Sequence, residues 1–137
     1  MHIREVMSRD VCVISPDDTL GRAAGVMAKH DIGCLPVGEN DRLVGFITDR
    51  DIVTRAVAGG RNADAPVREV MSRHVRYCFD DDEVQQVART MADLQLRRLP
   101  VVNRDKRLVG IVSLANFAQC GDRAASQDLL QGVAQPH

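Results

Sequence analysis

An internal repeat is the feature of this sequence that most constrains its fold. The hexapeptide REVMSR stands at positions 4–9 and again at positions 68–73, an offset of 64 residues. The same offset places MA at 27–28 on MA at 91–92, and LPV at 35–37 on LPV at 99–101. After one inserted residue, RLVG at 42–45 meets RLVG at 107–110. The chain is therefore two copies of one unit.

Each copy has the same order of predicted elements. A β-branched run, 11–14 in copy one and 75–79 in copy two, predicts a first strand. Apolar residues at positions i, i+3, i+4 and i+7 then predict a helix: Leu20, Ala23, Ala24 and Met27, and in copy two Val84, Val87, Ala88 and Met91. Two strands joined by a polar turn follow, 34–37 with 43–48 and 98–102 with 108–113. A last helix is expected to start near Asp49 and near Leu114.

This order predicts an α+β fold of two β-α-β-β-α repeats. The expected boundaries are 3–58 for repeat one, 59–66 for a linker and 67–120 for repeat two. The tail, 121–137, contains only the apolar pair Leu129 and Leu130, which leaves open a short helix or disorder. Because three strands with a helix on either side leave one face of the sheet bare, we expect the two sheets to pack face to face with pseudo-two-fold symmetry, leaving clefts at their contact.

Composition argues against several classes of partner. With 18 basic and 19 acidic residues the net charge is -1, which does not suit a phosphate backbone. The chain has no Trp, 1 Tyr and 3 Phe, so it lacks platforms on which single-stranded bases stack. No apolar run resembles a secretory signal or a membrane span. We therefore expect a cytoplasmic protein with no nucleic-acid or membrane partner.

The four cysteines have no metal or disulfide spacing. Cys12, Cys34, Cys78 and Cys120 lie far apart, with no CxxC motif and no His pair at ligand spacing. We interpret them as small buried apolar residues and predict no metal site.

Two acidic clusters are typical of helix starts. In SPDD, Ser15 is a candidate N-cap with Asp18 as its N3 partner, and in DDDE, Asp80 is a candidate N-cap with Glu83 as N3. The helix dipole also favours negative charge there. We therefore interpret both clusters as caps and not as metal ligands.

The stretches GFITDRD (45–51) and GIVSLAN (110–116) have the strongest functional potential. Each runs from a strand into a helix and sets a hydroxyl three residues before an acid or amide, Thr48 with Asp51 and Ser113 with Asn116. This spacing fits a capping box. It equally fits a nucleotide site, because free N–H groups at a helix start suit a phosphate and a carboxylate accepts from ribose hydroxyls. Spacing alone leaves both interpretations open.

The order of these motifs resembles a known family. VMS, DIGCLPV and LVGFITDRDIV, followed by VMS, QLRRLPVV and LVGIVSLAN, are similar to a tandem pair of cystathionine-β-synthase (CBS) domains, the Bateman module. The resemblance covers about residues 3–120, and copy one is particularly similar to standalone bacterial CBS proteins of the hypoxic-response type.

The resemblance implies an adenosine-containing ligand, AMP, ADP, ATP, NAD or S-adenosylmethionine, bound in the clefts between repeats. Asp51 would hold the ribose hydroxyls and Thr48 the phosphate or ribose. The other expected site residues are Arg50, with Ile14, Leu35 and Pro36 framing the adenine, and in copy two Ser113, Asn116, Arg98, Leu99 and Pro100.

Copy two departs from the family pattern. Asn116 stands where the family has Asp, and an amide offers one acceptor oxygen where a carboxylate has two. Arg97 and Arg98 could reach a phosphate or could be ordinary exposed strand residues, and copy one has Gly33 and Cys34 at those positions. The two predicted sites are chemically unequal.

The sequence therefore predicts a regulatory module. It contains no GxGxxG, GxxxxGK[ST] or HExxH motif, so we expect no enzymatic activity. The family implies homodimers, with candidate contacts at Ile52, Val53, Ala56, Val57, Leu114, Phe117 and Ala118, and an unidentified client protein. One alternative is an interaction scaffold that binds no nucleotide. Another is a redox or metal sensor that uses at least two of the cysteines.

Overall fold

The chain divides into two compact units that do not coincide with the two repeats. The computed structural model describes residues 1–119, so Cys120 and the predicted tail lie outside the described residues. The continuous unit is Cys12–Val75, and the split unit combines Met1–Val11 with the chain from Arg76 onward. The start of each repeat therefore belongs to the unit that contains most of the other repeat.

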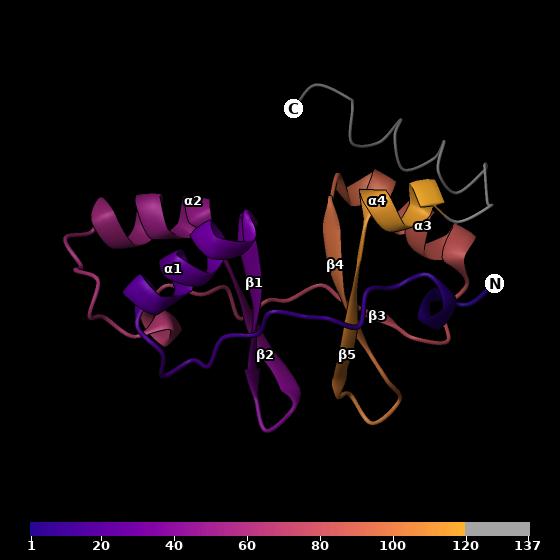
Figure 1. The fold of residues 1–137 in the computed structure, drawn as a ribbon, viewed down its shortest axis with the longest axis horizontal. Coiled ribbons are helices and arrows are strands. Elements are labelled where there is room, and N and C mark those ends of the chain that lie inside the picture. The colour runs from indigo at the N-terminus through magenta and orange to yellow at the C-terminus, as the bar shows by residue number, and fades with distance from the viewer. Residues whose placement is uncertain (120–137) are drawn as a thin grey trace. The chain divides into compact units, whose positions relative to one another are not determined.

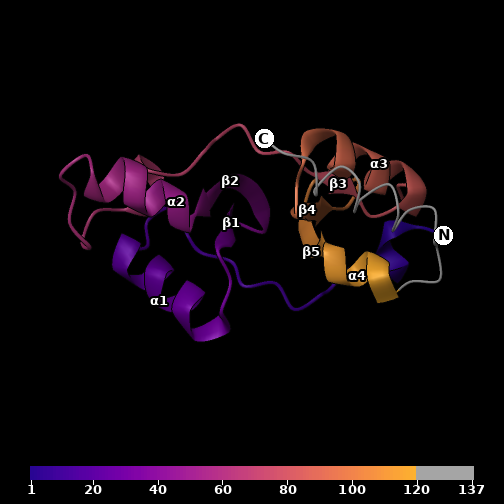
Figure 2. The ribbon, with the colours of Figure 1, turned by 90° about the horizontal axis from the view of Figure 1, so that it is seen from above.

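The continuous unit is a β-hairpin with helices on one side (Figures 1 and 2). Strands β1 and β2 are antiparallel, with Leu35 opposite Ile47. The helix after β2 begins as α-helix and continues as π-helix, as the hydrogen bond from Ala58 N to Val53 O illustrates. The elements are α1 (Leu20–His30), β1 (Cys34–Glu39), β2 (Arg42–Thr48), α2 (Asp49–Asp51), the π-helix η2 (Ile52–Val57) and the 3-10 turn η3 (Val67–Glu69).

The split unit repeats this arrangement with one more strand. A short strand, β3, runs parallel to β4, and β4 is antiparallel to β5. The helices again lie on one side of the sheet (Figures 1 and 2). The elements are the 3-10 turn η1 (Ile3–Glu5), β3 (Cys78–Phe79), α3 (Val84–Leu94), β4 (Arg98–Val102), β5 (Leu108–Ser113) and α4 (Leu114–Gln119). The predicted α+β class and the order of the later elements are confirmed.

Each hexapeptide packs against a strand of the other repeat. Ser8 exchanges two backbone hydrogen bonds of 2.9 Å with Ile111 on β5, and Ser72 does the same with Phe46 on β2 at 2.8 and 2.9 Å. The methionine before each serine packs onto a glycine of the same strand. A Cβ added at Gly110 would lie 2.6 Å from Met7 Sδ, and one at Gly45 would lie 2.6 Å from Met71 Sδ. The repeated hexapeptide is thus a structural strap.

Each unit has its own hydrophobic core, and the strap contributes to it. Ile3 and Met7 join the core of the split unit, whose other members are Cys78, Val84, Val87, Ala88, Met91, Leu99, Val101, Val112 and Phe117. Val67, Val70 and Met71 join the core of the continuous unit, whose other members are Ile14, Leu20, Ala23, Met27, Leu35, Val37, Ile47 and Ala56. The predicted helix stripes are therefore buried, with the exception of Ala24, which is exposed.

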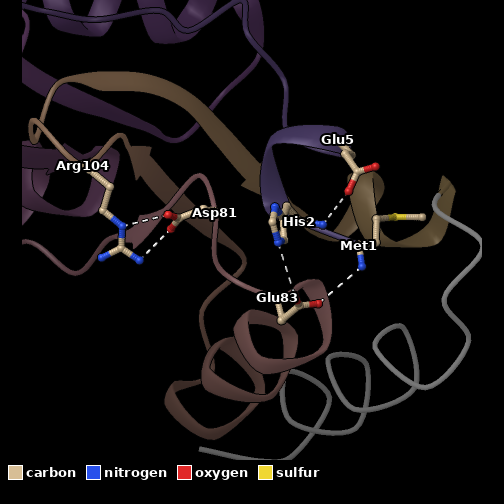
Figure 3. A network of polar contacts seen from close by, with 6 residues as sticks. All are labelled: Met1, His2, Glu5, Asp81, Glu83 and Arg104. Carbon is tan, nitrogen blue, oxygen red and sulfur yellow. Dashed lines mark hydrogen bonds and ion pairs between the residues drawn. The ribbon is translucent and has the colours of Figure 1, made fainter.

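Polar contacts fasten the start of the split unit to α3 (Figure 3). Ile3 N donates to Asp82 O at 2.9 Å, and Val84 N donates to Met1 O at 3.0 Å. His2 Nε2 lies 3.4 Å from Glu83 Oε1. Beside them, Arg104 donates two hydrogen bonds to Asp81, which lower the pKa of that carboxyl group. These surface ion pairs fix position and contribute little stability.

The predicted first strands are largely absent. In the continuous unit, 11–14 is reduced to one parallel bridge, with Ile14 N donating to Pro36 O at 3.1 Å and Gly38 N to Ile14 O at 2.9 Å. In the split unit only Cys78 and Phe79 of the predicted run 75–79 form a strand. The expectation of three strands in copy one was wrong because Val13, 46% exposed, faces away from the core.

The predicted helix caps were also wrong. Ser15 and Asp18 form a turn, in which Ser15 N donates to Asp18 Oδ2 at 2.9 Å and Asp18 N to Ser15 O at 3.1 Å. The N-cap of α1 is Thr19, whose Oγ1 accepts from Arg22 N at 3.1 Å.

Copy two has the equivalent turn. There Phe79 N donates to Asp82 Oδ2 at 2.9 Å, and Glu83, not Asp80, is the N-cap of α3. The SPDD and DDDE clusters therefore make the turn that precedes each helix.

Candidate functional site

Thr48 and Asp51 form a reciprocal capping box at the start of α2. Asp51 N donates to Thr48 Oγ1, and Thr48 N donates to Asp51 Oδ2, each at 3.0 Å. Both side chains are half-buried. Within residues 1–119, we find no hydrogen bond to the second carboxylate oxygen, Oδ1. The box therefore holds the carboxylate in place and leaves one acceptor oxygen for a ligand.

The backbone N–H groups at this helix start are already paired. Asp49 N donates to Gly33 O at 2.9 Å, and Arg50 N donates to Asp49 Oδ1 at 2.7 Å. With Asp51 N on Thr48 Oγ1, the first three N–H groups of α2 each have an acceptor. Contact with a ligand at this position would come from side chains, namely the Thr48 hydroxyl, the Asp51 carboxylate and the exposed guanidinium of Arg50.

The structure brings the predicted residues of copy one together in the continuous unit. Cys34 on β1 is opposite Thr48 on β2. Two residues further along β1, Pro36 O accepts from Ile14 N. The side chains of Ile14 and Leu35 are 1% and 0% exposed, because they belong to the core. Ile14 and Leu35 can therefore offer only backbone groups to a ligand.

The predicted residues of copy two come together in the split unit, where the polar groups of Ser113 and Asn116 are paired with each other. Asn116 Oδ1 accepts from Ser113 N at 2.8 Å and from Ser113 Oγ at 3.1 Å. Asn116 Nδ2 donates to Ser8 Oγ at 3.2 Å. Arg98 is exposed and lies opposite Ser113 on the neighbouring strand. The side chain of Leu99, 2% exposed, belongs to the core, and Pro100 is buried.

Sequence reasoning missed Ser8. It lies 108 residues before Asn116 in the chain and within the hexapeptide, which served above only to establish the two copies and their offset. The sequence offered one signal that this position matters: both copies of the hexapeptide have a serine, Ser8 and Ser72, directly after a methionine. Its importance becomes visible only once the strap is placed on the strand of the other repeat.

Cys12, Cys34 and Cys78 form no disulfide with one another. Cys78 is buried, and its burial, with smaller effects from Asp82 and Asp80, raises the pKa of the thiol to about 12. Cys12 and Cys34 are half-buried. In the described part of the chain, no three His, Cys, Asp or Glu side chains gather as they would around a metal ion.

The continuous unit also has an apolar surface pocket between α1 and η2. Its volume is about 130 Å³, and Leu20, Ala24, Ile52 and Ala56 contribute apolar walls. Val53 and Val57 on η2 are 60% and 67% exposed. None of the helices within residues 1–119 has the length and apolar character that a bilayer span needs.

Comparison with known proteins identifies close relatives of both repeats. Residues 3–58 and 67–120 each match the CBS domain family. The chain is 35% identical to Hypoxic response protein 1 of Mycobacterium tuberculosis over 135 residues, which cover 97% of this chain and 94% of that protein. These matches confirm the resemblance drawn from the repeated motifs.

Solved structures support the same family assignment. The crystal structure of Hypoxic Response Protein I with two coordinated zinc ions superposes with a TM-score of 0.77 at 37% identity, covering 87% of this chain and 98% of that one. The CBS domain pair of protein MJ0100, in complex with 5'-methylthioadenosine and S-adenosyl-L-methionine, has a TM-score of 0.72 at 28% identity, covering 87% and 94%. The chain therefore has the fold of a CBS domain pair.

Proposed function

Because this chain belongs to the CBS-domain family, we propose that it is a non-enzymatic regulatory module that binds an adenosine-containing ligand. The ligand classes we consider are AMP, ADP, ATP, NAD and S-adenosylmethionine. The related domain pair of MJ0100 was crystallised with two adenosine derivatives, which supports this choice. Binding would report the state of a metabolite pool to a client protein.

The single observation that carries the proposal is the free oxygen of Asp51. Thr48 fixes one carboxylate oxygen, so Oδ1 is held ready to accept from a ribose hydroxyl without first losing another bond. The Thr48 hydroxyl accepts from Asp51 N and can still donate to a ligand oxygen. Arg50 supplies an exposed positive charge for a phosphate.

Thermal shift with the five ligands tests the proposal. A ligand at 100 times its Kd adds about 2.7 kcal/mol to the free energy of unfolding, which raises the Tm measurably. We expect at least one ligand to do so. If none of the five moves the melting curve, this function is wrong and an interaction scaffold without a nucleotide becomes the better interpretation.

Asp51→Ala tests the residue itself. We expect it to weaken binding by about tenfold or more, since the ligand hydroxyl loses a charged acceptor worth about 1.5–3 kcal/mol. A 2'-deoxy ligand should lose a similar amount on the wild-type chain. Asn116→Ala is the matched control, because it removes the equivalent cap from the other unit. Equal affinity of wild type and Asp51→Ala would exclude Asp51 from the site.

We propose in addition that the module is a homodimer that uses η2. Val53 and Val57 are exposed on one helix beside the apolar pocket, whereas Phe117, 1% exposed, closes the core of its own unit and is not available. The double variant Val53→Asp, Val57→Asp should shift the mass measured by light scattering from dimer to monomer without lowering the Tm of the monomer. A wild-type chain that is monomeric at about 100 µM, where complexes of micromolar Kd form, would refute this contact.

A further inference from the structure

The apolar pocket of the continuous unit has three walls that backbone hydrogen bonds hold in place. Two walls are α1 and η2, the continuation of α2 in Figure 1, and the third is the loop 61–63 between the repeats. This loop is anchored at both ends, because Arg61 N donates to Ala56 O and Gly21 N donates to Ala63 O, each at 2.9 Å. The pocket is therefore pre-formed, as sites for small molecules usually are.

One of these walls is an irregular helix. In the π-helix η2 a hydrogen bond reaches back five residues, as from Ala58 N to Val53 O at 3.0 Å. Such turns are rare and occur frequently at functional sites. Among the helices within residues 1–119, η2 is the only π-helix, and it lines the pocket. The two observations together favour a binding site over a packing defect.

The inner part of the pocket is apolar and small. Its volume is about 130 Å³, and its apolar walls include Leu20, Ala24, Ile52 and Ala56. An apolar cavity of about 150 Å³ in another protein holds one benzene molecule. The pocket therefore suits a phenyl ring or a branched alkyl group and is too small for an adenosine. Thr48, Arg50 and Asp51 do not line it, so it is separate from the proposed adenosine site.

The polar side chains that line the pocket, Arg61 and Asn62, both present hydrogen-bond donors. Arg61 Nη1 donates to Arg55 O at 3.2 Å, which holds the guanidinium beside η2. Its Nε lies 3.9 Å from the exposed carboxylate of Glu69, an ion pair that contributes little. Asn62 Oδ1 accepts from Asp64 N at 2.9 Å, which leaves Nδ2 as a donor. Donors with a positive charge call for an anion, and the guanidinium fork matches a carboxylate.

We infer that this pocket binds a small monocarboxylate whose apolar body is a phenyl ring or a branched alkyl chain. The body fills the space between α1 and η2, and the carboxylate accepts hydrogen bonds from Arg61 and Asn62. A ligand that contacts α1, η2 and the loop 61–63 at once stabilises the three in this arrangement. The inference goes beyond the proposed function and does not depend on it.

Titration of the full chain with benzoate, followed in ¹H–¹⁵N spectra, tests the inference. We expect saturable shifts of the backbone amide signals around the pocket, with a Kd on the order of 1 mM, because so small a ligand makes few contacts. Benzyl alcohol keeps the ring without the charge and should bind about tenfold more weakly. Acetate keeps the charge without the ring and should cause no saturable shift.

Two substitutions locate the site. Ala24→Leu fills the pocket from an exposed position on α1 and should abolish the benzoate shifts. Ala28→Leu is the matched control, because it makes the same change one turn later on α1, outside the pocket. Arg61→Gln should weaken benzoate by about tenfold and leave benzyl alcohol unchanged, a difference that a purely structural role of Arg61 would not produce.

Four results would overturn the inference. No saturable shift with benzoate, or shifts that persist in Ala24→Leu, would exclude the site. Equal affinities for benzoate and benzyl alcohol would exclude the carboxylate as the recognised group. An affinity for benzoate that falls as the protein concentration rises would assign the pocket to a second copy of the chain, through the proposed contact at Val53 and Val57. None of these results bears on adenosine binding, which the thermal shift tests separately.

Discussion

At the scale of single residues, two glycines determine how the straps fit. Gly45 and Gly110 lie where β2 and β5 meet Met71 and Met7, and a side chain there would meet both the sulfur and a backbone oxygen. At Gly110 the backbone contact is Ser8 O, 2.8 Å from an added Cβ. A methionine can change rotamer, whereas a paired backbone oxygen cannot move without breaking its hydrogen bonds. Glycine is therefore required for close approach rather than for its backbone angles.

Gly110→Ala should destabilise the protein by about 1–3 kcal/mol, the usual cost of overpacking. Urea denaturation followed by circular dichroism measures the change. Gly25→Ala is the control, since a Cβ at this exposed position in α1 meets nothing within 4 Å. Alanine there should stabilise the helix by about 0.5–1 kcal/mol. A neutral Gly110→Ala would show that the strap does not pack as described.

Side-chain hydrogen bonds were predictable from the sequence where the two residues are close together in the chain. The Thr48–Asp51 box could be predicted because a hydroxyl and an acid three residues apart meet at any helix start. The pairing of Asn116 with Ser8 could not, since no local rule relates residues 108 positions apart. The sequence indicated that Asn116 departs from the family pattern, and the structure shows the hydrogen bonds that its amide makes with Ser113 and Ser8.

At the scale of elements, the helix starts show how two local patterns compete. Ser15-Pro16-Asp17-Asp18 satisfies both a capping box and a turn with proline at its second position. The turn forms, with Asp18 N donating to Ser15 O. The helix then begins one turn later, after Thr19, whose hydroxyl caps it without an acidic partner at N3. Sequence patterns located the region of the start and not the residue.

Thr19→Ala should therefore lower the free energy of unfolding by about 1 kcal/mol, because Arg22 N loses its acceptor. Ser15→Ala removes only an exposed bond of 3.2 Å from Asp17 N and should cost less. Chemical denaturation of the two variants side by side compares these costs. If Ser15→Ala lowered the free energy of unfolding more than Thr19→Ala does, Ser15 would be the N-cap and the helix would start four residues earlier.

The missing first strands have a related cause. A β-branched run such as 11–14 suits a strand, but a strand also needs a neighbour along its length. Only Ile14 meets β1, through the two hydrogen bonds on either side of it. The predicted strand is therefore reduced to a single bridge at Ile14, because the segment has no second contact with β1.

At the scale of the whole molecule, the chain crosses between units twice. Each repeat contributes its strap to the unit that contains most of the other repeat, so neither core is complete within one repeat. The repeat itself is visible in the sequence. The exchange is not, because two identical hexapeptides give no indication of which copy of the strand each one contacts.

Two fragments of similar length test this crossing. Residues 12–75 contain every member of the core of the continuous unit, including Val67, Val70 and Met71. Residues 1–58 follow the repeat instead and lack these three side chains, while their Ile3 and Met7 have no core to join. Since each fully buried apolar side chain is worth about 1.5–3 kcal/mol and whole domains about 5–15 kcal/mol, the loss of three is decisive. We expect 12–75 to keep helical circular dichroism and a cooperative melt, and 1–58 to be largely unfolded.

Met71→Ala within 12–75 should move that fragment toward the behaviour of 1–58, because Met71 is the side chain that the strap places on Gly45. If 1–58 melted as cooperatively as 12–75, the folding unit would be the sequence repeat and the exchange of straps would not determine stability.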